Sequence, residues 1–70
     1  MASVRFSASG YGSTESRYRT RRAAVCAVER EVGEMAADHG LDPTEAVFRG
    51  PDEWTLSSHS GEEIARWEIF

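Results

Sequence analysis

The residues best suited to chemistry are a run of arginines in the first third of the chain, Arg17-Tyr18-Arg19-Thr20-Arg21-Arg22. Guanidinium groups bind carboxylates and phosphates through paired hydrogen bonds, and a tyrosine ring among them can stack on a flat partner group. We therefore expect a partner-binding cluster for an anionic partner, made of Arg17, Tyr18, Arg19, Arg21 and Arg22. The alternative is a solvated basic turn that pairs with acidic residues of the same chain, among them Glu62, Glu63 and Glu68.

A glycine-rich segment, Gly10-Tyr11-Gly12-Ser13-Thr14, lies between a predicted strand and a predicted helix. Phosphate-binding loops occupy that position because the backbone amides at a helix N-terminus attract anions. The third glycine of the dinucleotide-binding fingerprint would fall at Glu15, however, and a carboxylate there repels phosphate. The pattern favours a flexible strand-to-helix turn over an anion site.

Other catalytic or metal-binding patterns are missing. Cys26, His39 and His59 are the only soft metal ligands, and no two of them share a motif spacing. Ser58 and Ser60 flank His59, but no orienting acid or oxyanion hole accompanies them. All eight basic residues are arginine, and the lack of lysine excludes a Walker A loop and a Schiff-base site. We expect no enzymatic activity, no cofactor and no metal.

Composition predicts one small globular domain over residues 1–70. The chain is 40% hydrophobic and 29% charged, which is too apolar for disorder and too interrupted by charge for a membrane span. A single cysteine excludes an internal disulfide framework, and no apolar run resembles a secretion signal. We expect a cytoplasmic location and no membrane contact.

Hydrophobic periodicity predicts a strand followed by a long helix. Val4, Phe6 and Ala8 alternate with polar residues, as in a half-buried strand. Apolar residues at helical spacing then predict a helix within residues 14–39 that buries the stripe Tyr18, Val25, Val28, Val32, Met35 and His39. Gly40 suits the left-handed position after the helix, and Leu41 can fold back onto its last turn.

The second half of the chain has the alternation of strands, with Trp54 and Trp67 predicted in the core. Residues 42–49 are ambiguous between a strand and a short helix, since Asp42-Pro43-Thr44-Glu45 is also a good helix start. The predicted fold class is α+β. It is a two-layer domain in which one long helix packs on an antiparallel or mixed sheet of three or four strands, in the order β-α-β-β-β.

The predicted helix carries small residues on the side away from its apolar stripe. Small side chains allow another backbone to approach closely, so this side predicts self-association, most simply as a two-fold dimer. The predicted oligomer interface consists of Ala23, Cys26, Ala27, Gly33 and Ala37. The alternative is a solvated helix surface that is rich in alanine because alanine is a good helix former.

Charge divides the chain into two halves. Residues 1–32 have a net charge of +3 and residues 33–70 a net charge of −7, giving −4 overall. Arginines lie near the predicted helix N-terminus, and Glu34 and Asp38 lie near its C-terminus, contrary to the preference of the helix dipole. Such locally unfavourable choices indicate function. We expect a small binding module, an inhibitor or accessory protein, that acts through protein–protein contacts. The alternative is a nucleic-acid-binding protein that uses the arginine cluster, against which the pI of about 5.0 counts.

Overall fold

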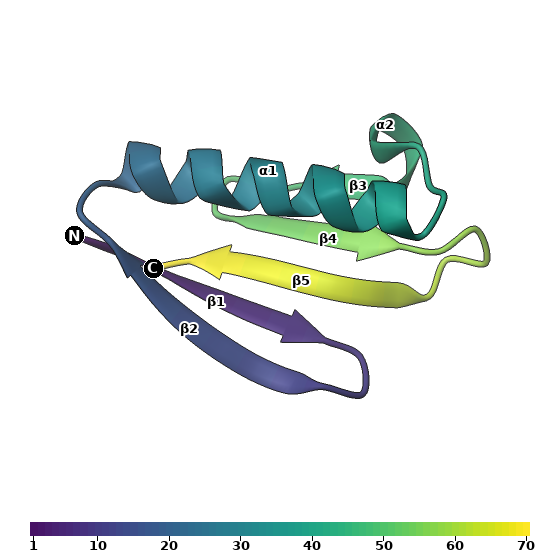
Figure 1. Cartoon of the computed structure of the whole chain (residues 1–70), viewed down its shortest axis with the longest axis horizontal. Helices are drawn as coiled ribbons and strands as arrows, with labels where there is room; N and C mark the ends of the chain where they lie inside the picture. Colours follow the sequence, from purple (N-terminus) through teal and green to yellow (C-terminus); the bar gives the residue numbers. More distant parts are fainter.

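The computed structural model describes all 70 residues as one helix packed on a five-stranded sheet (Figure 1). The elements are β1 (Ala2–Ala8), β2 (Gly12–Tyr18), α1 (Arg21–Asp38), α2 (Pro43–Ala46), β3 (Val47–Arg49), β4 (Glu53–Ser57) and β5 (Glu63–Ile69). The strand order is β2-β1-β5-β4-β3, and every neighbouring pair is antiparallel. The predicted α+β class with one long helix is confirmed, but the sheet has five strands, of which β2 was not predicted.

Strand β2 occupies residues that were predicted to begin the helix. Gly10 and Gly12 have φ angles of 84° and 77°, which let the chain reverse within three residues and pair Ala8 with Gly12. The pairing then runs without interruption to Ala2 and Tyr18. The prediction of a strand-to-helix turn at residues 10–14 is therefore wrong, and the anion site weighed there has no helix N-terminus to supply it.

Helix α1 begins only at Arg21 and has well-defined ends. The hydroxyl of Thr20 accepts a hydrogen bond from the Ala23 amide at 3.1 Å, which makes Thr20 the N-cap. At the other end Gly40 has a φ of 66°, and the Leu41 amide donates to the Ala36 carbonyl at 2.8 Å. This is the predicted helix stop, and Leu41 is buried as expected.

Residues 42–49 form both of the elements between which the sequence was ambiguous. Asp42 caps the single turn of α2 by accepting hydrogen bonds from the amide and the hydroxyl of Thr44. The chain then extends directly into β3, which pairs with β4. These two short elements close the end of the sheet opposite to β2 (Figure 1).

The core lies between α1 and one face of the sheet. Trp67 and Leu56 are completely buried, and Trp54 is nearly so, which confirms both tryptophans as core residues. Against them α1 places Ala24, Val28, Val32 and Ala36. The predicted stripe is therefore partly wrong: Val25 and Met35 are only half-buried, His39 is exposed and Tyr18 is on β2. The small alanines allow the helix to lie close to large side chains on the sheet.

Helix α1 and the β1–β2 hairpin are close together at the start of the helix and diverge toward its end (Figure 1). Burial along β1 follows this divergence. Ala2 and Val4, at what we call the closed end, are 5% and 3% exposed. Phe6 and Ala8, at the open end, are only half-buried. The fold thus leaves a wedge-shaped space beside the last two turns of α1.

Candidate functional site

A groove at the open end is the main concave feature of the molecule. It combines a hollow of about 230 Å³ with an adjoining one of about 490 Å³, and Phe6 and Met35 line both. We call it the open groove. Its apolar lining residues are Phe6, Ala8, Tyr11, Met35, Ile64 and Trp67, and Ser9, His39 and Ser58 are uncharged or weakly basic polar residues in the same lining. The rings of Phe6 and Trp67 lie 5.1 Å apart at an angle of 46°, so the half-buried Phe6 presents an aromatic floor that rests on the buried Trp67.

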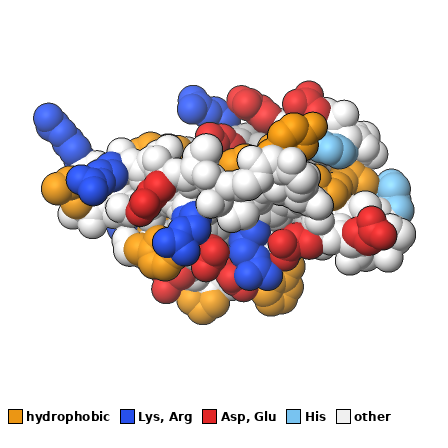
Figure 2. Space-filling view, turned by 90° about the horizontal axis from the view of Figure 1, so that it is seen from below, with side chains coloured by type: hydrophobic (Ala, Val, Ile, Leu, Met, Phe, Trp, Pro, Cys, Tyr) orange, Lys and Arg blue, Asp and Glu red, His pale blue; other side chains and the backbone are white.

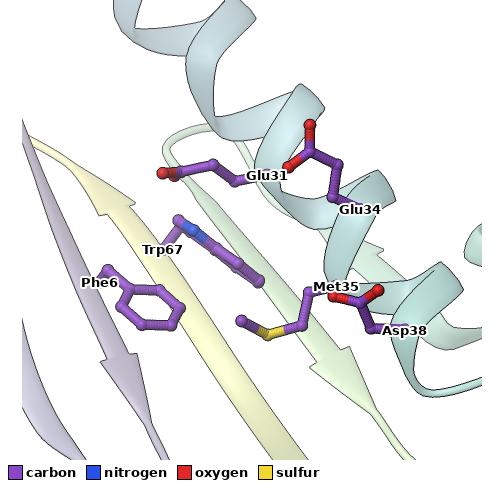
Figure 3. Close-up of a pocket in the computed structure, with 6 residues that line it drawn as sticks. All are labelled: Phe6, Glu31, Glu34, Met35, Asp38 and Trp67. Atoms are coloured by element: carbon purple, nitrogen blue, oxygen red, sulfur yellow. The ribbon is translucent and has the colours of Figure 1, made fainter.

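Carboxylates surround this apolar floor. Figure 3 shows Glu31, Glu34 and Asp38 on α1 along the helix side of the groove, with Glu31 directed toward Trp67 and Asp38 beside Met35. Glu62 and Glu63 line the other hollow, and Glu63 alone has an ion partner, Arg66, at 2.9 Å. No arginine lines either hollow. The last turn of α1 also lacks any basic residue, so the helix dipole adds to the negative potential there.

The indole nitrogen of Trp67 is a buried donor without a partner. The side chain is completely buried, and its Nε1 forms no hydrogen bond within the chain. In Figure 3 the nitrogen-bearing edge of the ring lies on the side of Glu31, at the helix side of the groove. A buried N–H without an acceptor costs about 1–3 kcal/mol, so this group lowers the stability of the fold.

The sequence missed the open groove because it placed the helix over residues that form β2. Phe6 and Met35 were expected to be covered, and Glu62 and Glu63 were considered as partners for arginine. One signal was present: Glu31, Glu34 and Asp38 are spaced by three and four residues, which places them on one side of a helix. An acidic stripe next to half-buried apolar residues indicates an edge that the core does not fill.

The predicted arginine cluster is divided among β2, the short connection that follows it, and α1. Arg17 and Tyr18 end β2, Arg19 precedes the N-cap, and Arg21 and Arg22 open α1. The helical start predicted for this cluster is therefore wrong for its first half, which is extended. Arg21 is engaged, since its guanidinium contacts the Asp52 carboxylate and donates to the Pro51 carbonyl at 2.9 Å. Arg17, Arg19 and Arg22 form no ion pair, and none of the cluster pairs with Glu62, Glu63 or Glu68.

The predicted oligomer interface lies on the side of α1 away from the sheet, as expected. Ala23, Cys26 and Ala37 are exposed, and Ala27 and Gly33 are half-buried. Arg30 has the same helical phase as these small residues and is exposed among them. Burying this side of the helix would therefore also desolvate an arginine. Its role in self-association stays a prediction.

Three further observations bear on the chemistry of the chain. No three histidine, cysteine, aspartate or glutamate side chains gather where they could hold a metal ion. Neither helix has the length and apolar character needed to cross a membrane. No family model, curated protein or solved structure matches the chain.

Proposed function

We propose that the protein is a non-enzymatic interaction module whose open groove binds a basic segment of a partner protein. The observation that supports this proposal is the combination of an aromatic floor with a rim of five carboxylates and no arginine. The rim attracts lysine or arginine side chains, and the floor accepts apolar ones. The preferred segment therefore alternates basic and apolar residues.

The Phe6 ring and the carboxylates beside it suggest how such a segment is held. A cationic side chain over the half-exposed Phe6 ring gains a cation–π interaction, and Glu34 and Asp38 complete its neutralisation. Because an apolar floor and a charged rim lie side by side, binding favours a peptide that carries both kinds of side chain over a simple cation.

A fluorescent hexapeptide of alternating arginine and leucine tests this function, with a peptide of alternating glutamate and leucine as its control. Binding is measured by anisotropy at low salt, where charge attraction is least screened. We expect the basic peptide alone to bind. Changing Glu34→Gln together with Asp38→Asn removes two charges and should weaken binding about twofold to thirtyfold, given roughly 0.2–1 kcal/mol per exposed pair.

A matched variant makes this loss specific. Glu45→Gln removes one exposed carboxylate from α2, outside the open groove, and should leave affinity unchanged, whereas Glu34→Gln alone removes the same charge from the rim and should weaken binding. Equal losses in the two variants, or equal binding of the acidic peptide, would mean that net charge rather than the groove controls binding. That result would contradict the proposal.

A nucleic-acid-binding role is the second candidate, because Arg17, Arg19 and Arg22 are free of ion pairs within the chain. Three arginines on duplex DNA predict that log K falls with log salt at a slope of about −2.7, from roughly −0.9 per phosphate contact. The acidic end of α1 would repel the same polymer. We therefore expect no shift of duplex DNA or RNA in a gel at low micromolar protein, and a submicromolar complex with that slope would favour this second function.

A further inference from the structure

Strand β2 is a long and unprotected edge of the sheet. It has seven residues, all exposed except the half-buried Tyr18, and it contains neither proline nor a bulge. The opposite edge strand, β3, has only three residues and follows directly on α2. Natural proteins usually shorten, twist or cover an edge strand because its free backbone groups can pair with another chain. Only one of the two edges here is protected in this way.

The hydrogen bonds at the start of β1 show which backbone groups of β2 are free. Ser3 exchanges two bonds with Phe70, at 2.9 Å and 3.3 Å, on the side of β5. Backbone groups alternate sides along an antiparallel strand, so the even-numbered residues of β1 point toward β2. Their register partners on β2 point back toward β1, and these are Gly12, Thr14, Ser16 and Tyr18. The amides and carbonyls of Ser13, Glu15 and Arg17 therefore point to the open edge.

We infer that a second copy of the chain pairs with this edge, with β2 antiparallel to its counterpart and Ser16 on the two-fold axis. In this register Glu15 of each copy lies opposite Arg17 of the other, and both residues have outward-pointing backbone groups. Four backbone hydrogen bonds and two opposite-charge pairs form symmetrically. On the other face Thr14 lies opposite Tyr18 of the second copy, a favourable pairing of a β-branched and an aromatic side chain.

Charge complementarity extends beyond the edge itself. On the outer face of the sheet Arg5 lies in register between Glu68 and Glu15, so the charges alternate up to the edge. Arg17 of a second copy would continue this alternation beyond Glu15. Figure 2, which views the molecule from the side of the β2 edge, shows arginine and acidic side chains close together there, beside a broad area of backbone and small polar residues.

Other arrangements fit less well. Sliding one copy by two residues in either direction places Glu15 on Glu15 or Arg17 on Arg17, and like charges directly opposite each other are destabilising. Sliding it by one residue aligns free backbone groups with groups that are already bonded to β1. The small-residue side of α1 would require burial of Arg30. The β2 edge therefore fits a second copy better, whatever the open groove binds.

Disulfide trapping tests the register. In a Cys26→Ser background, Ser16→Cys should form a dimer of twice 7.8 kDa on mild oxidation. Residues facing each other at such a non-hydrogen-bonded position lie about 4.5 Å apart at Cα, within the range for a disulfide. Thr14→Cys is the matched control, because the two copies of residue 14 would lie about 14 Å apart. Equal trapping of the two variants, or of neither, would overturn the inference.

Charge reversal supplies an independent test that needs no cysteine. Glu15→Arg and Arg17→Glu each place like charges opposite each other in both pairs, and each should raise the dimer dissociation constant about tenfold or more. An equimolar mixture of the two variants restores opposite charges and should dimerise with wild-type affinity. Circular dichroism verifies that both variants fold. A mixture no tighter than its components, a monomeric wild-type chain at high micromolar concentration, or a dimer split by Ala27→Glu but not by these changes would contradict the inference.

Discussion

The two ends of the wedge between α1 and the β1–β2 hairpin differ in what fills them. At the closed end Ala2, Val4 and Ala24 are buried in the core. At the open end Phe6 and Met35 are half-buried, carboxylates line the space, and the Trp67 N–H is unpaired. The same strand and the same helix thus build core at one end and a partly exposed groove at the other. The stability of this fold and its proposed function therefore depend largely on different residues, with Trp67 shared between them.

The largest loss of stability is expected for Trp67, which belongs both to the core and to the lining of the open groove. Trp67→Ala removes the largest completely buried side chain and should destabilise the fold by about 3–5 kcal/mol, enough to unfold so small a domain. Thermal unfolding by circular dichroism measures this change. An unfolding temperature equal to that of the wild type would mean that Trp67 is not buried and that the register of β5 is wrong.

Matched truncations on α1 compare the two ends directly. Val28→Ala, in the filled part of the core, should cost about 2 kcal/mol, from two buried methyl groups at roughly 0.8 kcal/mol each and a small cavity. Met35→Ala, at the open groove, should cost less than about 1 kcal/mol because its side chain is already half-exposed. Urea titration of both variants gives the two values. Equal costs would mean that the open end is as well packed as the core.

A smaller loss of stability is expected from a change at the junction between β2 and α1. Thr20→Ala removes the N-cap hydrogen bond to Ala23 and should cost about 1 kcal/mol, or roughly 4–8 °C in unfolding temperature. Thr20→Ser is the control, because serine keeps a hydroxyl that can accept the same hydrogen bond from the Ala23 amide. If the control lost as much stability, the N-cap would not be the cause.

The smallest expected effect is a pH dependence of the stability of the fold, caused by Asp42 at the N-cap of α2. The Thr44 hydroxyl, and secondly its amide, hold the pKa of Asp42 below its usual value. A lowered pKa means that this cap stabilises the fold above the ordinary aspartate pKa and is lost as the pH falls through the folded value. Asp42→Asn keeps a capping side chain that does not titrate. The difference in unfolding temperature between wild type and variant should therefore change only at acidic pH, and a difference independent of pH would contradict this cause.

The sequence predicted the core elements well because their signals are local. Gly40 and Leu41 ended the helix as expected, and alternation around Trp54 and Trp67 identified two core strands. The missing strand had no such signal: Ser13, Glu15 and Arg17 are polar, as are Thr14 and Ser16 on the other side, because neither face of β2 is buried. Without hydrophobic alternation an edge strand does not appear in a periodicity analysis. The groove that depends on this strand could not be predicted either.

The two indole N–H resonances give the most direct test of the open groove as a binding surface. Trp67 lines the groove, whereas Trp54 lies under the Arg49 guanidinium at 5.2 Å and outside the groove. Proton–nitrogen correlation spectra are recorded while the arginine–leucine hexapeptide is added. We predict a shift of the Trp67 indole resonance, because the bound peptide covers Phe6, whose ring packs against Trp67 at 5.1 Å, with the Trp54 signal unchanged. A peptide that binds while the Trp67 signal stays in place, or that shifts both signals equally, would contradict the account.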